Sequence, residues 1–579
     1  MNRTQQMLLT LLTCLCSTGL FAQVTVDIKI SGLSEPLEEN ARLFLTLAEV
    51  QGHTLLSEGR MRHLHKKAPQ EIADALKPYG YYRADIKSRL TQTSPEQWQA
   101  HYSVDPGPPV RIGEFNFNLG GAMKDDPEAQ TLINNFPLRE GYVLNHSAYK
   151  DIKESLAELA RERGYFDAEL VTHQIEIDLE AYKARIYLDY DSGPRYDFGE
   201  VQLEQDVLDP EFLQRYIHFH QGEPYELNEL INFQHALNDS DYFQSVEVSP
   251  GQPKTESLRI PVDVSLTPRK RHRFTLGLGY GTDTGARTRF GWEMPRVNKK
   301  GHRFDTELRV SEIGYSLTAH YRVPVFNPRT DQIVYSAGII DETTDTSESN
   351  IRTIGVSLNH SRRDWRESIS LNYQQEEFII ANVRGDSTLL MPGASWSRTW
   401  GNDFINTFDG LRFDFSMRGA SKKVISDTDF MQLLGGIKFI TSLSARNRII
   451  ARGRLGSTLT QDFEQLPSSV RFFAGGSQSV RGYAYESLGP VDANGLVIGG
   501  KNLMVGSIEY DYSIGDQWSV ALFYDGGNAI DNLSDDLERG AGFGFRWKSP
   551  VGPVRIDFAS AITRAGNPWR IHINIGPDL

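Results

Sequence analysis

The residues best suited to specific chemistry lie in one glycine-rich segment, residues 471–483, which reads Arg-Phe-Phe-Ala-Gly-Gly-Ser-Gln-Ser-Val-Arg-Gly-Tyr. Glycine adopts backbone angles that other residues resist, so the segment is predicted to be a loop. Arg481 stands directly before Gly482, and a guanidinium can grip a carboxylate through two parallel hydrogen bonds, which a lysine cannot do. A lone arginine on a surface turn is usually solvated. Arg481 is therefore a functional candidate only if the rest of the chain builds a lumen that receives it.

Patterns for catalysis or metal binding do not occur in the sequence. It has no Gly-x-Ser-x-Gly motif and no spacing that proposes a Ser-His-Asp triad. The alternating glycines of residues 277–281 lack the strand-turn-helix context of a nucleotide loop. The histidine pairs His63/His65 and His218/His220 have no carboxylate arrangement that would fix a metal. We therefore expect no catalytic residue, no cofactor, no metal and no enzymatic activity.

Composition narrows the class of protein. The chain has 579 residues and a formal net charge of −14, which argues against nucleic acid as a partner because phosphate neutralisation needs a basic surface. Its length predicts several domains. It contains no run of about 18 apolar residues, so no transmembrane helix is expected. A membrane β-barrel remains compatible with this composition, because its strands are apolar only at every second position.

The N-terminal segment, residues 1–22, has the pattern of a secretory signal peptide. Arg3 supplies the positive charge, the apolar stretch follows, and the segment closes on Leu-Phe-Ala before Gln23. Both cysteines, Cys14 and Cys16, lie inside it. The exported chain is therefore expected to lack disulfides and thiol chemistry.

Three similar units follow one another between residues 23 and 267. A Gly-Tyr-aromatic motif recurs at Gly80 and Gly164, and a weaker copy surrounds Tyr242. Joints that begin Gly-Pro recur at Gly107 and Gly193. A recurring period of this length indicates an array of modules. We place the units at 23–105, 106–191 and 192–267.

Each unit has the pattern β-α-α-β-β. In the second unit a strand is expected over residues 111–119. Apolar residues at helical spacing then predict a helix that ends at Gly164, and two alternating strands follow over residues 169–177 and 184–190. The fold class expected for this region is α+β. The tyrosines of the recurring motif are expected to pack a helix end against the sheet.

The pattern changes to long alternating strands over residues 268–579. Phe304, Thr306, Leu308 and Val310 alternate with charged residues, and the same alternation recurs near the C-terminus. Charged residues on one strand face suit a wet lumen. At about 9–11 residues per spanning strand, this region accommodates roughly 14 to 18 strands, and we expect an all-β transmembrane barrel of sixteen.

The three units resemble polypeptide-transport-associated (POTRA) domains, on their element order and the recurring Gly-Tyr-aromatic motif. The segment after them resembles the barrel family that inserts outer-membrane proteins. Three POTRA units before the barrel are similar to the translocation and assembly module type. This resemblance implies a Gram-negative outer membrane with the POTRA units in the periplasm. It also implies unfolded outer-membrane or autotransporter clients, contact with the lipid bilayer and a TamB-like inner-membrane-anchored partner.

The resemblance also implies roles for particular residues. The signature-loop residues of that family correspond here to Val480, Arg481, Gly482 and Tyr483. In the family the arginine reaches into the lumen and is held near an aromatic-x-Asp-x-Gly motif, which corresponds here to Phe523, Asp525 and Gly527. The alternation of residues 520–525 puts Asp525 on the strand face of Phe523. We therefore expect Arg481 and Asp525 to form a structural latch.

The first and last strands of the barrel are expected to meet at a weak lateral seam. The first is glycine-rich, and the last ends in Gly-Pro, where proline has no N–H for a ladder. The seam residues are expected to be Phe274, Leu276, Gly277, Gly279, Ile571, Ile573, Ile575, Gly576 and Pro577. A seam with few hydrogen bonds predicts sideways opening, pairing of a client strand with an exposed edge, and insertion.

Three other functions remain open from the sequence. A passive pore or two-partner secretion channel would place a helix plug before the POTRA units, and none is visible before Val24. Transport of envelope lipids is compatible with the resemblance. A barrel enzyme has no catalytic constellation to support it.

Overall fold

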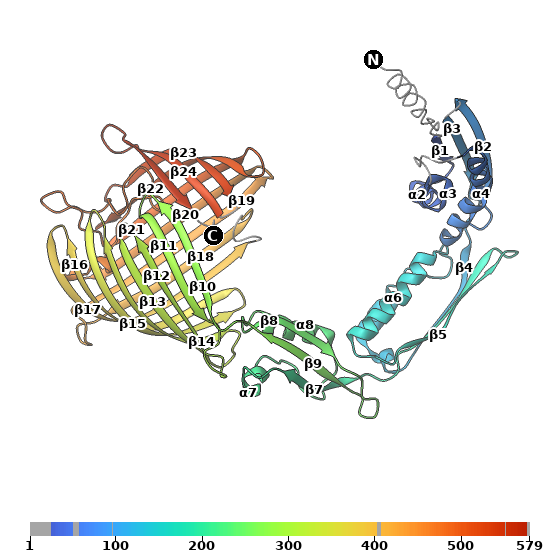
Figure 1. Ribbon diagram of the computed structural model, residues 1–579, viewed down its shortest axis with the longest axis horizontal. Helices are drawn as coiled ribbons and strands as arrows, with labels where there is room; N and C mark the ends of the chain where they lie inside the picture. Colours follow the sequence, from blue (N-terminus) through green and yellow to red (C-terminus); the bar gives the residue numbers. More distant parts are fainter. Residues whose placement is uncertain (1–24, 50–56, 95–96, 402–406, 550–551, 576–579) are drawn as a thin grey trace, which may run out of the picture. The chain divides into compact units, whose positions relative to one another are not determined.

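We describe the protein from a computed structural model, which covers residues 25–49, 57–94, 97–401, 407–549 and 552–575 (Figure 1). The expected signal peptide, with Cys14 and Cys16, lies outside these residues, as do Gly576 and Pro577 of the expected seam. The chain divides into two compact units. The first holds the first two small sheets and part of the third, and the second holds the rest of the third and the barrel.

Three small three-stranded sheets occupy the N-terminal part, with strand orders β1-β3-β2, β4-β6-β5 and β7-β9-β8. The first set of elements is β1 (Thr25–Ser31), α2 (Glu35–Phe44), α3 (Thr46–Glu49), α4 (Glu58–Leu76), η1 (Lys77–Tyr79), β2 (Asp85–Ser94) and β3 (Gln97–Asp105). The second is β4 (Arg111–Gly120), η2 (Ala122–Asp125), α5 (Pro127–Asn134), α6 (His146–Glu162), β5 (Glu169–Asp178) and β6 (Lys183–Asp191). The third is β7 (Asp197–Glu204), α7 (Pro210–Gln214), α8 (Leu227–Asn238), β8 (Phe243–Pro250) and β9 (Arg259–Pro268).

The second unit illustrates why these sequences fold in this way. The Asn145 side chain caps α6 by accepting hydrogen bonds from the backbone N–H groups of Ser147 and Ala148. The apolar stripe of α6, which includes Ile152 and Leu156, is buried against the sheet. Gly164 ends the helix with a left-handed φ of 80°. Figure 1 shows α6 lying along the strands that it covers.

In the second unit, the tyrosine of the recurring motif connects the start of α5 with the end of α6. Tyr165 is buried and donates to Asp126 at 3.0 Å, and Arg163 donates to the same carboxylate at 2.9 Å. Burial raises the pKa of Asp126, but the backbone N–H of Glu128 and these two donors outweigh it and hold that pKa below its usual range. The motif is therefore structural in this unit, as the sequence predicts.

The third copy of the motif contacts the barrel. The Tyr242 hydroxyl donates to the carbonyl of Gly301, in the turn between β11 and β12, at 2.6 Å. The Arg303 guanidinium carbon lies 4.5 Å from the centre of the Tyr242 ring. This tyrosine therefore fixes its segment to the turn between β11 and β12.

The barrel is a sheet of sixteen strands in sequence order, and every neighbouring pair with a recorded register is antiparallel. Its first eight strands are β10 (Arg273–Gly281), β11 (Gly285–Met294), β12 (Arg303–Ser311), β13 (Gly314–Pro324), β14 (Asp331–Thr343), β15 (Ser347–Arg362), β16 (Trp365–Ile380) and β17 (Val383–Gly401). The other eight are β18 (Gly410–Ala420), β19 (Phe430–Ser444), β20 (Asn447–Thr460), β21 (Asn502–Ser513), β22 (Trp518–Ile530), β23 (Glu538–Ser549), β24 (Gly552–Ala561) and β25 (Trp569–Ile575). The predicted fold class, three α+β modules followed by a sixteen-stranded barrel, is confirmed.

The strand alternation separates an apolar outer face from a polar inner face. On β22, Leu522 is 63% exposed, whereas its neighbours Phe523 and Asp525 on the other face are 5% and 0% exposed. On β10, Leu276 and Leu278 are 72% and 79% exposed. Large apolar side chains that point outward all along the strands are the surface that a bilayer covers. None of the described helices is long and apolar enough to cross a membrane.

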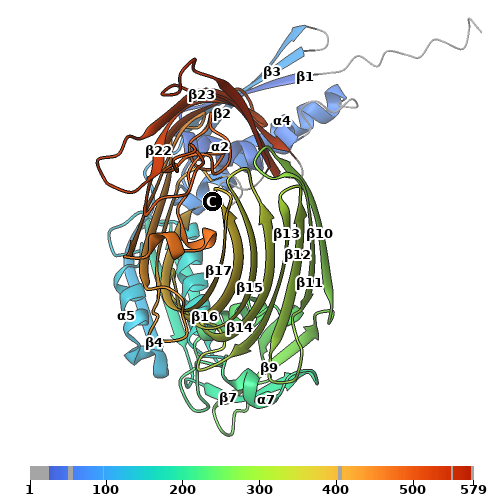
Figure 2. The same ribbon diagram turned by 90° about the vertical axis from the view of Figure 1, so that its left-hand side faces the viewer.

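The longest connection of the barrel joins β20 to β21 and folds inward. It spans residues 461–501 and includes the short helices η3 (Phe463–Gln465) and η4 (Ser468–Val470). In Figure 2 this orange segment lies inside the ring of strands. It contains the glycine-rich stretch that the sequence singles out, and we call it the inner segment.

Candidate functional site

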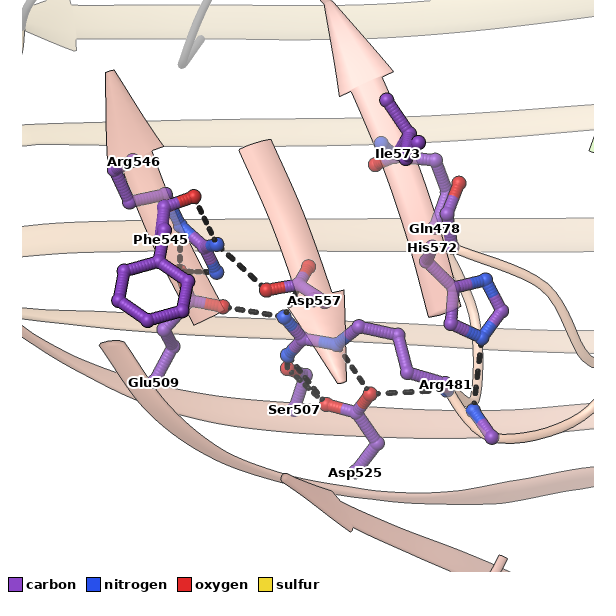
Figure 3. A network of polar contacts seen from close by, with 12 residues as sticks. Gln478, Arg481, Ser507, Glu509, Asp525, Phe545, Arg546, Asp557, His572 and Ile573 are labelled. Atoms are coloured by element: carbon purple, nitrogen blue, oxygen red, sulfur yellow. Dashed lines mark hydrogen bonds and ion pairs between the residues drawn. The ribbon is translucent and has the colours of Figure 1, made fainter. Parts of the chain in front are cut away.

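Arg481 of the inner segment lies in a buried polar network on the barrel wall (Figure 3). Its guanidinium donates two hydrogen bonds to the Asp525 carboxylate of β22, from Nε at 2.7 Å and from Nη2 at 2.8 Å. Nη1 donates to Glu509 at 2.6 Å and to Asp557 at 3.2 Å, and Nη2 also donates to Ser507 at 3.3 Å. All five guanidinium N–H groups therefore have acceptors, which a lysine with three donors on a single nitrogen could not match.

A second arginine completes the network from the wall itself. Arg546 of β23 donates to Glu509 at 2.8 Å and forms an ion pair with Asp557 at 2.6 Å. Three carboxylates thus face two guanidinium groups, and Arg481 and Asp525 are only 2% and 0% exposed. A buried charge is tolerated only when it is paired and hydrogen-bonded, so each member of this network requires the others.

The neighbours of Arg481 explain the rest of the loop motif. Val480 is fully buried in a small apolar cluster inside the barrel. Gly482 has a φ of 97°, and a Cβ there would lie 2.9 Å from the backbone nitrogen of Ala561, so the position requires glycine. The Tyr483 hydroxyl donates to Glu538 at 2.6 Å and lies 2.7 Å from the Thr563 hydroxyl. Each motif residue therefore fixes the inner segment to the wall in a different way.

The structure places the other two predicted latch residues beside this network. The Phe523 ring centre lies 3.5 Å from the guanidinium carbon of Arg481, a cation–π contact. Gly527 is too close to the neighbouring strand β21 to carry a side chain, since a Cβ would lie 2.4 Å from the carbonyl oxygen of Met504. Gly527 thus allows close strand packing.

Sequence reasoning missed several members of the network. Ser507 and Glu509 lie two residues apart on β21, and Arg546 and Asp557 fall on the polar faces of the last strands. Their alternation marks them as residues of the lumen. It does not reveal their partners, because the loop that meets them comes from an earlier part of the sequence.

A second anchor holds the start of the inner segment, and no motif in the sequence predicts it. Glu376 of β16 is 2% exposed. Its carboxylate accepts hydrogen bonds from the Ser468 hydroxyl at 2.7 Å and from the backbone N–H and hydroxyl of Ser469. Arg418 and Gln432 donate to the carbonyls of Ser469 and Val470, at 2.9 and 2.7 Å. Short helix η4 is therefore bound to the wall formed by β16, β18 and β19.

The two anchors lie on different walls of the barrel. Strand β16 is the seventh of the sixteen strands and β22 is the thirteenth, so the two are nearly opposite one another around the ring. The inner segment accordingly crosses the lumen between them. This arrangement holds a loop in place.

The predicted seam residues lie at the two ends of the sheet. Phe274, Leu276 and Ile571 point outward, with exposures of 64%, 72% and 50%. Gly279 lies opposite Arg287, and a Cβ there would be 2.9 Å from the Arg287 Nε. Gly277 lies opposite Arg289. The two glycines therefore leave room for arginine side chains on the inner face.

Few bonds join β10 and its terminal turn to β25. Among the described residues, the Thr282 N–H donates to the Ile573 carbonyl and the Ile573 N–H to the Thr282 hydroxyl, both at 3.3 Å. Arg287 of the neighbouring strand β11 reaches across and donates to the Ile575 carbonyl at 3.0 Å. All other neighbouring strands form continuous ladders, whereas no ladder is recorded between the described parts of β10 and β25. Among the residues that the structure describes, this seam therefore has fewer backbone hydrogen bonds than any pair of consecutive strands.

Comparison with known proteins assigns the chain to a family. Residues 270–578 match the model of the Omp85 superfamily domain. The chain belongs to the Omp85 superfamily. Residues 27–106 match a model described as POTRA domain TamA domain 1, and residues 110–193 match the POTRA model described as surface antigen variable number repeat. This Omp85 protein therefore lies in the outer membrane of a Gram-negative bacterium, with its POTRA domains in the periplasm.

Similar proteins are distant in sequence. The outer membrane protein assembly factor BamA of Nitratidesulfovibrio vulgaris is 22% identical, over 92% of this chain and 70% of its own length. BamA of Neorickettsia risticii is 21% identical, and the match covers 76% of this chain and 62% of the relative. The crystal structure of BamA from Haemophilus ducreyi lacking POTRA domains 1–3 superposes with a TM-score of 0.70 at 18% identity, covering 81% of this chain and 99% of that one. At this identity the superposition demonstrates the shared fold.

Removal of the Arg481 side chain should destabilise the barrel. In Arg481→Ala three carboxylates lose their shared donor, and breaking a buried ion pair typically costs about 3–5 kcal/mol. Arg481→Lys keeps the charge but not the five donors, so its loss should be intermediate. The measurement is the temperature at which the folded barrel converts to the unfolded band in semi-native electrophoresis. Arg454→Ala is the control, because Arg454 lines a cavity beside the inner segment without an ion pair among the described residues. Equal unfolding temperatures for all four proteins would refute the latch.

Loss of the second anchor should loosen the inner segment without removing Arg481. In Glu376→Leu the Ser468 and Ser469 donors lose a charged acceptor, and hydrogen bonds of this type contribute about 1.5–3 kcal/mol each. We expect a larger single-channel conductance in planar bilayers, because the start of the segment no longer stays against its wall. Glu377→Leu is the matched control, since Glu377 is the next residue on β16 and is exposed on the other face. The same conductance in both variants would contradict this role of Glu376.

Proposed function

We propose that this protein is a non-enzymatic assembly factor that helps to insert or secrete β-barrel and autotransporter-type proteins through the seam between β10 and β25. The observation that carries the proposal is the contrast between that seam and the rest of the barrel. Every other strand pair is a ladder, and the described parts of β10 and β25 share only isolated contacts. A strand edge with unpaired N–H and C=O groups accepts another extended chain with little demand on its sequence.

The physical steps follow from this geometry. A client strand that pairs with the free edge of β10 replaces water on polar backbone groups that cannot enter lipid unpaired. The outward side chains of β10, such as Leu276 and Leu278, already face the bilayer, so a strand added to this edge continues an apolar outer surface. The sheet then grows sideways into the membrane. No covalent step is required for this growth of the sheet.

Two observations support this function over a passive pore. The relatives named above are outer membrane protein assembly factors. The inner segment crosses the lumen and is anchored on two walls, which narrows any continuous water path. Transport of envelope lipids through the same seam would need the same opening, so the choice of client must be tested directly.

A disulfide that locks the seam provides the test. Thr282 and Ile573 are hydrogen-bonded across the seam, and the chain has no cysteine after residue 22. In Thr282→Cys/Ile573→Cys, oxidation should reduce insertion of an outer-membrane barrel client into proteoliposomes at least tenfold, and reduction should restore it. Each single cysteine variant is the control. Client insertion at the full rate by the oxidised protein would rule out the seam mechanism.

The finer assignment is to the translocation and assembly module. It is supported by the three small sheets before the barrel and by the match of the first domain to the TamA model. We propose that a TamB-like inner-membrane-anchored protein docks on a periplasmic sheet edge, where strand addition is available.

The partner can be sought by photo-crosslinking. Strand β2 is an edge of the first sheet, and Thr91 lies within it. A photo-crosslinkable residue at Thr91 should give a covalent adduct with a large inner-membrane-anchored protein in cells. The same residue at Gln99 of the central strand β3 is the control and should give none. Adducts with soluble proteins only, or no adduct from Thr91, would reject docking on this edge.

A further inference from the structure

The inner segment contacts both sides of the seam, and neither contact involves the Arg481 side chain. On one side, the backbone N–H and the hydroxyl of Ser477 donate to the Asp283 carboxylate at 2.8 and 2.6 Å. Asp283 lies in the turn that directly follows β10. On the other side, the backbone N–H of Gly482 donates to Nε2 of His572 on β25 at 2.9 Å (Figure 3). Both edges of the seam are thus bonded to one short stretch, residues 477–482.

The two seam side chains also face one another. His572 is 1% exposed, and its Nδ1 lies 3.8 Å from the Asp283 carboxylate. Because Nε2 accepts a hydrogen bond from Gly482, the neutral ring must carry its proton on Nδ1, on the side of Asp283. No hydrogen-bond partner of Nδ1 is found among the described residues. A buried His–Asp pair at this distance adds an electrostatic contact across the seam without a strand ladder.

The stretch that bridges the seam is fixed to the rest of the barrel through Arg481. Arg481 lies between Ser477 and Gly482 and is held by Asp525 and Glu509 on β22 and β21. The stretch therefore connects both edges of the seam to strands β21 and β22, which belong to the continuous part of the sheet. Such a connection can replace a ladder, because hydrogen bonds to a carboxylate are stronger than bonds between neutral groups.

We propose that Asp283, Ser477, Gly482 and His572 form a clasp that holds one end of the seam closed and must be released before the barrel opens fully. This proposal rests on the proposed function, since it concerns the opening of the same seam. The clasp lies at the end of β10, next to the Thr282–Ile573 contacts. Because the POTRA domains precede β10, its beginning lies on the periplasmic side and the clasp lies on the opposite side of the membrane.

The position of the clasp gives the opening a direction. Between Arg273 and Tyr280, the described part of β10 has its ladder on the β11 side and no recorded backbone bond to β25. A client that arrives from the periplasm therefore meets the beginning of β10 first. Pairing can advance along β10 until it reaches the clasp, and further opening then requires the contacts of Asp283 and His572 to break.

Spin-label distances across the seam test the clasp without any client. Nitroxide labels at Leu276→Cys and Ile571→Cys would report on the two seam strands from outside the barrel, where both residues are exposed. In the otherwise unchanged full chain in nanodiscs, pulsed electron paramagnetic resonance should give one narrow distance distribution. Asp283→Ala/His572→Leu should broaden it and lengthen its mean by about one strand spacing, ~4.8 Å.

Conservative variants separate the clasp from a general loss of stability. His572→Gln offers an acceptor to Gly482 and should restore much of the narrow distribution. Asp283→Asn keeps the side-chain volume and one acceptor oxygen, so it should broaden the distribution less than Asp283→Ala and provides a folded variant if the double one is not recovered. His320→Leu is the matched control, because His320 pairs with Asp305 at 2.9 Å between β13 and β12, which carry no residue of the clasp.

The outcomes distinguish this proposal from the function on which it rests. Unchanged distances in the double variant and in Asp283→Asn would overturn the clasp, and so would equal broadening in His320→Leu. Neither result bears on whether the seam inserts clients, which the disulfide lock measures. Conversely, unimpaired insertion by the locked protein would overturn the function, while a distance change in the clasp variants would still establish the clasp.

Discussion

The five hydrogen bonds of one guanidinium group, made inside a barrel wall, are the interaction on which the rest of this structure depends. Arg481 is 2% exposed, and its partners Asp525, Glu509 and Asp557 come from three different strands. A charge buried this deeply is stable only when its donors are all satisfied. The wall therefore needs the inner segment as much as the segment needs the wall. This mutual requirement keeps a long loop inside the lumen.

The proposed function needs, in the same barrel, an edge that is not fixed. A fully closed barrel has no free strand edge, and such a barrel could not pair with a client strand. In this protein the described ends of β10 and β25 lack a ladder, and their position depends on side chains and on the inner segment. Strong bonds between the loop and the wall thus coexist with weak bonds across the seam. In the proposed mechanism, the rigid network holds the inner segment in place and the seam supplies the edge that moves.

Much of the fold could be predicted because its signals are local. The helix that ends at Gly164 and the strands around it follow from spacing and capping within about twenty residues. The alternation of β22 places Asp525 and Phe523 on the inner face, and the alternation of β24 does the same for Asp557. The pairing of Glu376 with Ser468 and Ser469 could not be predicted, because about ninety residues separate the partners and serines carry no distinctive signal.

The sequence by itself determined the order of modules, the membrane type of the strands, the glycine-rich loop and the residues that face the lumen. Each of these depends on short-range periodicity, which survives in a linear chain. The tertiary structure alone decided which acids surround Arg481, where the start of the inner segment is anchored, and which residues join it to the seam. These contacts arise when barrel closure brings strands from distant parts of the chain around one loop. Asp283 and Ser477 are a clear case: 194 residues separate them, and they meet because the first turn of the barrel returns beside the loop of its eleventh strand.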